Sequence, residues 1–180
     1  MKFNKKINII YVLPAHKSAS GGSKVIYQHS EIINKLNINN ISSQVLHLKK
    51  SKLSKLSLSF KKKIFKSSSK KYGWNLNDMK AADSYAPSSS WNKNKIEIKK
   101  DFNLNPKTDF LIIPEIWGHF GKQILINKKI KYAIFVQGFY HMNSFYNHKK
   151  LFESYSKAKY IITASAHTLE NLKYMFPKFK

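Results

Sequence analysis

The residues best suited to chemistry fall in short clusters, each directly after an apolar run. The first cluster follows residues 110–113 and contains Glu115, Trp117 and His119. A carboxylate and an imidazole can act as general acid or base or bind sugar hydroxyls, and an indole can stack on a sugar ring. Glu115 and Trp117 are therefore candidate substrate-binding residues. The simpler alternative is that Glu115 caps the next helix.

The second cluster follows residues 132–136 and contains Gln137, Tyr140 and His141. Gln137 and Tyr140 are candidate substrate-binding residues, because they place a polar and an aromatic side chain after the apolar run. His141 is the candidate catalytic base, since an imidazole changes its charge near neutral pH. The alternative is that His141 is a solvated loop histidine with no chemical role.

A pair of glycines, Gly21 and Gly22, follows the apolar run at residues 7–13 and precedes a helical pattern. Glycine lets the backbone approach a ligand and tolerates a positive φ, and the free amides at a helix start favour an anion. We therefore count both as candidate substrate-binding residues. A flexible turn without a ligand is the alternative.

No pattern for a metal or a nucleotide cofactor is found. His16, His119 and His141 fall in three loops after expected strands, but none has the i, i+4 spacing of a metal-binding pair on a helix. Gly21 and Gly22 match neither the three spaced glycines of a dinucleotide site nor a loop ending in Gly-Lys-Ser/Thr. We expect no metal and no cofactor.

Alternating strands and helices are expected to position these residues. Apolar runs at 7–13, 43–48, 110–113, 132–136 and 160–163 predict strands, and helical spacing predicts helices after the loop 14–22 and over 118–126, 149–157 and 166–176. Such alternation predicts an α/β fold, a Rossmann-like doubly wound parallel sheet in one domain over residues 1–180. Ligands bind beyond the carboxyl ends of strands in such sheets, where the candidate residues fall.

Residues 49–94 interrupt this pattern as an insert rich in Lys and Ser. Leu53, Leu56, Phe60 and Ile64 have helical spacing and predict a basic amphipathic helix that contacts anionic membrane. Leu56, Leu58 and Phe60 also alternate with serines, so a strand is the alternative. The rest of the insert is expected to be partly irregular. The expected membrane-contact residues are Lys52, Lys55, Lys61, Lys62, Lys63 and Lys66.

The formal net charge of +24 favours an anionic partner, although a biased coding composition explains it equally well. All 33 basic residues are Lys, and without Arg specific base readout in nucleic acid is disfavoured. The sequence has no cysteine and no apolar run of membrane-spanning length. Residues 7–13 fit a buried strand better than the core of a signal peptide. We expect a cytoplasmic protein, and the membrane surface that it would contact is the inner face of the plasma membrane.

Several segments together resemble a known family. They are INIIYVLP at 7–14, GGSKVIYQHSEIINKL at 21–36, DFLIIPEIW at 109–117, KYAIFVQGFY at 131–140 and AKYIITASAHTLENLKYMFP at 158–177. They are similar to the strands, glycine loop and helices in the N-terminal domain of GT-B-fold glycosyltransferases of the glycosyltransferase family 4 type, which act in bacterial polysaccharide biosynthesis. The insert at 49–94 has no clear counterpart.

The resemblance implies transfer of a sugar from a nucleotide-sugar donor to a glycan or lipid-linked acceptor, in a cleft between two domains. It implies that Gly21 and Gly22 lie near the donor phosphates and the acceptor. Many members have a histidine where this chain has Gln137, so that histidine's role does not carry over. The donor-binding domain would follow the final helix, and the sequence ends at Lys180. We therefore expect an acceptor-side half of the enzyme, which is either a truncated gene product or one subunit of a split enzyme that works with a separate C-terminal-domain subunit.

A second function class remains open from the sequence. The chain can instead be a nonenzymatic basic protein that binds nucleic acid or a membrane surface. Tyr72, Trp74 and Trp91 in the Lys-rich insert have side chains that stack on bases. This alternative leaves the strand–helix alternation unexplained.

Overall fold

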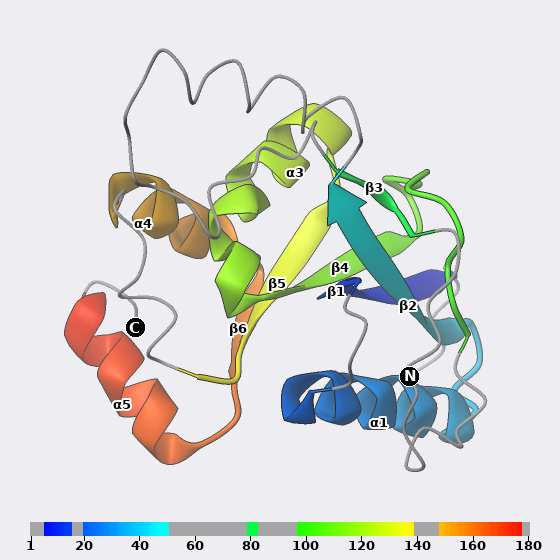
Figure 1. The fold of residues 1–180 in the computed structure, drawn as a ribbon, viewed down its shortest axis with the longest axis horizontal. Coiled ribbons are helices and arrows are strands. Elements are labelled where there is room, and N and C mark those ends of the chain that lie inside the picture. The colour runs from blue at the N-terminus through cyan, green and yellow to red at the C-terminus, as the bar shows by residue number, and fades with distance from the viewer. Residues whose placement is uncertain (1–5, 16–19, 51–78, 83–96, 139–147, 178–180) are drawn as a thin grey trace.

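A twisted six-stranded sheet forms the centre of the computed structural model, which describes residues 6–15, 20–50, 79–82, 97–138 and 148–177 (Figure 1). The strands are β1 (Ile7–Pro14), β2 (Ile41–Lys50), β3 (Met79–Ala81), β4 (Asp109–Pro114), β5 (Lys131–Val136) and β6 (Tyr160–Thr163). Their order is β3-β2-β1-β4-β5-β6, and every pairing is parallel except that of β2 with β3. The α/β class and the mostly parallel sheet are confirmed.

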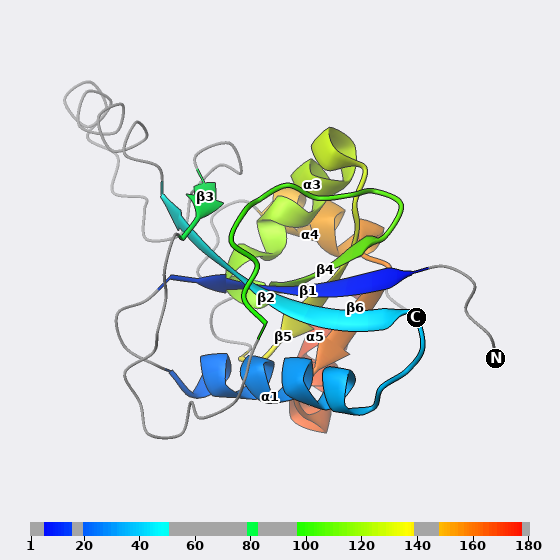
Figure 2. The ribbon, with the colours of Figure 1, turned by 90° about the vertical axis from the view of Figure 1, so that its right-hand side faces the viewer.

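Helices cover both faces of the sheet. Among the described residues they are α1 (Gly21–Lys35), α3 (Gly121–Lys128), α4 (His148–Lys157) and α5 (Ala166–Met175), with a 3₁₀ helix η2 (Glu115–Phe120) ahead of α3. Figure 2 shows α1 on one side of the sheet and α3 and α4 on the other. From the central strand β1 the chain adds β2 and β3 toward one edge of the sheet, and from β4 it adds β5 and β6 toward the other edge. This order is compatible with a Rossmann-like fold. The reversal of direction lies between β1 and β4.

Helix α1 is fixed to the sheet by a narrow buried face. Its side chains Ile26 and Tyr27 are buried against β1 and β2. The Tyr27 hydroxyl lies 2.9 Å from Nε2 of the buried His47, and the Ser43 hydroxyl donates to Ser30 Oγ at 3.0 Å. These buried polar contacts hold the middle of α1 against β2.

The helix expected over 118–126 begins instead as a 3₁₀ turn and becomes α-helical at Gly121. Two glycines explain the close packing there. A Cβ at Gly118 would lie 2.9 Å from Cε2 of Tyr155, and a Cβ at Gly121 would overlap the ring of Tyr132. Both tyrosines are fully buried, so the backbone of this turn lies directly on aromatic rings. That contact fixes η2 beyond the end of β4.

Two short described segments, one within and one after the stretch expected to be an insert, pair with the outer edge of β2. Residues Met79–Ala81 form β3, an antiparallel strand that the sequence patterns do not predict. Farther along the chain, Ile98 forms a parallel bridge with Val45 of the same strand. The expected amphipathic helix, with its lysines, lies outside the described residues, as do residues 83–96.

Candidate functional site

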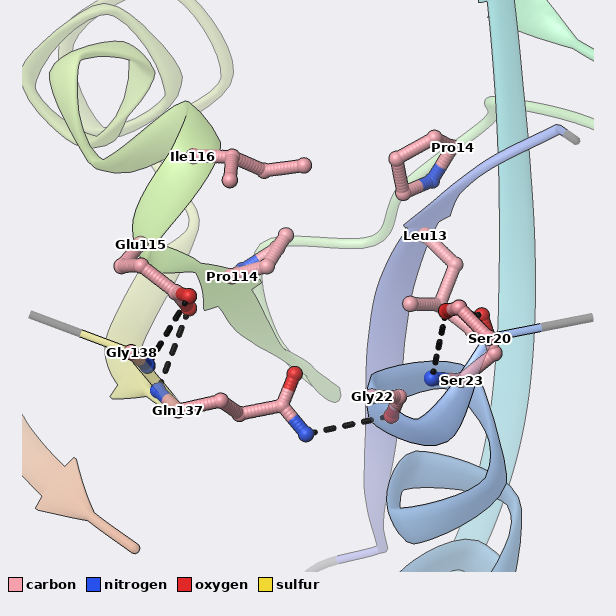
Figure 3. Close-up of a pocket in the computed structure, with 10 residues that line it drawn as sticks. All are labelled: Leu13, Pro14, Ser20, Gly22, Ser23, Pro114, Glu115, Ile116, Gln137 and Gly138. Atoms are coloured by element: carbon pink, nitrogen blue, oxygen red, sulfur yellow. Dashed lines mark hydrogen bonds between the residues drawn. The ribbon is translucent and has the colours of Figure 1, made fainter. Parts of the chain in front are cut away.

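A cavity of about 350 Å³ lies at the carboxyl ends of β1 and β4, where the sheet order reverses (Figure 3). The carboxyl end of β5 and the first turn of α1 complete its wall. This is the position at which open α/β sheets bind ligands, because loops from the two halves of the sheet diverge there. The lining residues are Leu13, Pro14, Ser20, Gly22, Ser23, Pro114, Glu115, Ile116, Gln137 and Gly138.

Glu115 holds the loop that follows β5. Its carboxylate accepts hydrogen bonds from the backbone amides of Gln137 and Gly138, each at 3.2 Å. The side chain is only 4% exposed, so it is a buried charge satisfied by amides from a neighbouring strand end. Glu115 is the first residue of η2, and its carboxylate reaches the backbone amides that directly follow β5. It therefore organises the cavity wall.

Gln137 joins the β5 side of the cavity to the α1 side. Its side-chain Nε2 donates to the carbonyl oxygen of Gly22 at 3.1 Å. A Cβ at Gly22 would lie 2.8 Å from Oε1 of Gln137, so the glycine allows the two segments to approach. The expected need for positive φ is wrong, because no described glycine has one and Gly22 lies within α1. The close approach of Gln137 explains this glycine.

Two serines form the third wall. Ser20 is the N-cap of α1, and its hydroxyl oxygen accepts from the backbone amide of Ser23 at 3.2 Å. The two hydroxyls also lie 3.0 Å apart. Neither serine was predicted as a site residue, although a serine just before a helical pattern is a known capping signal. Both therefore add hydroxyl groups to a cavity that also contains an amide and a carboxylate.

Three of the expected substrate-binding residues meet at this cavity, and two do not. Gly22, Glu115 and Gln137 line it, which confirms that these strand-end segments share one edge. Trp117 is only 2% exposed and packs within the core beside Phe120, so its expected stacking on a sugar is wrong for this arrangement. Gly21 is exposed and is not among the lining residues.

Other expected site residues lie outside the described part of the chain. These are Tyr140, the candidate base His141 and the third loop histidine, His16. His119 is described, and it lies on η2 with its ring 4.2 Å from that of Phe120, outside the cavity lining. The described residues therefore form a shared cavity, while the substrate-binding and catalytic assignments stay predictions.

The pKa of the buried Tyr155 depends on the charge of Glu115. Burial raises the pKa of Tyr155 well above its ordinary value, and the negative charge of Glu115 raises it further. The pKa of Tyr132, whose hydroxyl donates to the carbonyl of Ser154 at 2.5 Å, is also raised by burial. Both phenols are therefore neutral at physiological pH. Neither tyrosine belongs to the described lining of the cavity, in which Glu115 is the one ionisable residue.

Searches for a metal centre and for a membrane span gave nothing within the described ranges. No group of three or more His, Cys, Asp or Glu side chains there could hold a metal ion. No helix in these ranges is long and apolar enough to cross a membrane. Comparisons of the chain with protein-family models, with curated proteins and with solved structures found no match.

Proposed function

We propose that this chain is the acceptor-side half of a glycosyltransferase of the GT-B type, one that transfers a sugar from a nucleotide-sugar donor to a glycan or lipid-linked acceptor. The observation that carries the proposal is the cavity at the reversal point between β1 and β4, lined by Gly22, Glu115 and Gln137. All three follow expected strands in segments that resemble the family. The donor-binding domain is a separate subunit or a further part of the enzyme.

The proposed reaction needs two substrates in one dry cleft. The bond between the donor's anomeric carbon and its phosphate oxygen breaks, the nucleoside diphosphate leaves, and the acceptor hydroxyl forms the new glycosidic bond as it loses a proton. Positioning supplies much of the rate in such a two-substrate reaction, and closure between two domains excludes water. In this proposal the present domain holds the acceptor, and His141 is the candidate group that takes the proton.

The described polar groups suit a binding wall. Glu115 uses its carboxylate to hold two backbone amides, so it is a positioning residue. Gln137 and the two serines present amide and hydroxyl groups that can exchange hydrogen bonds with a glycan. The Lys-rich segment would hold the domain at an anionic membrane, where a lipid-linked acceptor is found; this part of the proposal rests on sequence alone.

Nuclear magnetic resonance of the isotopically labelled full chain tests this division of labour. We expect oligosaccharides from surface polysaccharides to shift the amide signals of Gly22, Gln137 and Gly138. A nucleoside diphosphate alone should leave these signals unchanged, because its pocket belongs to the other domain. Nucleoside diphosphate binding at these residues, with no effect of any oligosaccharide, would overturn the acceptor-side assignment.

A further inference from the structure

The charge of the cavity differs sharply from that of the chain. The sequence has 33 basic and 9 acidic residues, yet none of the described lining residues is basic. Their single ionisable side chain is the carboxyl of Glu115. Sites that bind phosphate groups normally place Lys or Arg against the ligand. The described lining, which consists of neutral groups and one carboxylate, therefore offers little to hold a phosphate at this position.

We propose that this cavity binds an uncharged, hydroxyl-bearing ring and discriminates against phosphate and carboxylate groups. The inference rests on the proposed function and names the part of the substrate that the site takes: one neutral sugar unit of the acceptor. It also replaces the expectation that Gly22 lies against donor phosphates.

The Gln137 side chain supplies the selective contact. Its backbone amide is held by Glu115 and its Nε2 by the carbonyl of Gly22, so the carboxamide has a defined orientation. Figure 3 shows the remaining atom, Oε1, turned into the space between Pro114 and Leu13. No described group donates a hydrogen bond to Oε1. A fixed amide oxygen accepts from a ligand hydroxyl and repels an anionic oxygen.

Within the described lining, the first turn of α1 is the feature that favours an anion, because helix N-termini carry partial positive charge. Two contacts weaken that effect. The hydroxyl oxygen of Ser20 already accepts from the amide of Ser23, so one free donor is occupied. The carboxylate of Glu115 lines the same cavity and opposes a second negative charge. The neutral ligand is therefore the better match.

The size and apolar surface of the cavity fit a single ring. Its volume of about 350 Å³ lies near the lower end of the roughly 300–1,000 Å³ found for small-molecule sites. Leu13, Pro14, Pro114 and Ile116 give it apolar surface, which can cover the C–H face of a sugar while the polar groups bind its hydroxyls. A small ring with both kinds of surface matches this lining.

Competition binding to the full chain tests the selectivity. The probes are a panel of methyl glycosides, the corresponding sugar 1-phosphates and inorganic phosphate, with binding followed by the amide signals of Gly22 and Gln137. We expect at least one methyl glycoside to bind and inorganic phosphate to leave it in place. The corresponding sugar 1-phosphate should bind more weakly than the methyl glycoside. Displacement by inorganic phosphate, tighter binding of the sugar 1-phosphate or no binding of any methyl glycoside would overturn the inference.

A matched pair of variants assigns the contact. Gln137→Leu removes the amide oxygen and should weaken methyl glycoside binding roughly three- to tenfold, the effect of losing one hydrogen bond. Gln28→Leu makes the same change at an exposed position of α1 outside the lining and should leave binding unchanged. Thermal unfolding of each variant confirms that it is folded. Equal binding by both variants would remove Gln137 from the proposal.

The two proposals fail in different ways. Selective binding of methyl glycosides, without any sugar transfer when extract fractions that could hold the donor-binding domain are added, would leave the cavity selectivity intact and refute the transferase. Sugar transfer with no methyl glycoside at this cavity would do the reverse. The binding and transfer experiments together therefore separate the ligand class from the reaction.

Discussion

The side-chain amide of Gln137 donates a hydrogen bond to the carbonyl oxygen of Gly22 across 3.1 Å, joining residues 115 positions apart in the sequence. The contact connects the loop after β5 to the first turn of α1, on the two sides of the sheet reversal. Because Glu115 also holds the backbone of Gln137, three separate segments share one hydrogen-bonded wall. The geometry of the cavity therefore depends on a few named contacts.

The Gly22→Ala variant should move Gln137 without unfolding the chain. The new Cβ would meet Oε1 of Gln137 at 2.8 Å, and a flexible side-chain end can turn away. Losing the hydrogen bond costs about 0.5–1.5 kcal/mol, and alanine in a helix recovers up to about 1 kcal/mol. We expect a change below about 1 kcal/mol in the free energy of unfolding, with a clear shift of the Gln137 side-chain amide signal.

Gly21→Ala is the control for this substitution. Nothing lies within 4 Å of a Cβ at Gly21, so the same chemical change meets open space one residue earlier. The Gln137 amide signal should stay in place in this variant. Equal shifts in the two variants would show that the close approach at Gly22 does not position Gln137.

The sequence predicts the shared edge of these residues but not their contacts. The apolar runs and the loops that flank them place Gly22, Glu115 and Gln137 after expected strands. Parallel strands bring such positions to the carboxyl edge of the sheet. The buried state of Trp117 was not predictable from its position, because a strand-end aromatic can face the core or the cavity. Its direction depends on η2, where Gly118 packs closely on Tyr155, and on the start of α3, where Gly121 packs closely on Tyr132.

Glu115→Gln should destabilise the chain and loosen the β5 loop. The carboxylate accepts from two backbone amides, whereas a carboxamide has one accepting oxygen and would face the other amide with a donor. Leaving one buried amide without an acceptor costs about 1–3 kcal/mol. Chemical unfolding measures the loss, and hydrogen exchange at Gln137 and Gly138 should accelerate.

Glu170→Gln provides the matched comparison, because Glu170 is exposed on α5. It should change the free energy of unfolding by less than about 0.5 kcal/mol. If Glu115→Gln were as mild as this control, the carboxylate would not be what holds the loop.

Gly121→Ala should be strongly destabilising. The added Cβ overlaps the ring of Tyr132, which is fully buried and whose hydroxyl is held by the carbonyl of Ser154. Overpacking of this kind costs about 1–3 kcal/mol. The loss is measured by chemical unfolding, and in a Tyr132→Leu background the same substitution should cost distinctly less. Strictly additive effects of the two substitutions would rule out the clash.

The stability of the chain should fall in alkaline solution partly through Tyr11. Burial raises the pKa of Tyr11 from 10.0 to about 12, so ionisation is easier in the unfolded chain than in the folded one. The stability that the neutral phenol contributes is complete below pH 10 and is lost as the pH rises toward about 12. Unfolding curves at pH 9 and 11 should show a smaller decline for Tyr11→Phe than for the native chain. Equal declines would contradict the assignment to Tyr11.

Replacing six lysines of the insert by Gln should abolish binding to anionic vesicles. The six are Lys52, Lys55, Lys61, Lys62, Lys63 and Lys66. Each lysine near such a surface contributes about 1 kcal/mol at moderate salt. Sedimentation with phosphatidylserine vesicles should show the loss, and binding by the native chain should fall at high salt.

The control variant carries the same charge change on exposed lysines elsewhere, namely Lys6, Lys80, Lys100, Lys107, Lys159 and Lys173. It should retain most of the binding. Equal binding of the native chain to neutral and anionic vesicles, or equal losses in the two variants, would contradict a specific membrane-contact segment.

The edge strand β3 shows where pattern-based prediction ends. Residues 79–81 are only three long and lie within a Lys- and Ser-rich stretch, so neither length nor alternation indicates a strand. Pairing with Leu48, Lys49 and Lys50 of β2 creates it. Long-range pairing of this kind is a property of the folded sheet. The three-residue sequence of β3 does not by itself indicate that it pairs with β2.

Sugar transfer by the purified chain, measured with radiolabelled nucleotide sugars and polysaccharide precursors, tests the central claim most directly. The chain alone should form no product, because the proposed donor pocket lies on another domain. Adding fractions of an extract from cells that make the chain should produce labelled glycan, and replacing Gly22 by Val should reduce that product more than it reduces stability. Product from the chain alone would contradict the half-enzyme, and no chain-dependent product with any fraction would contradict the transferase.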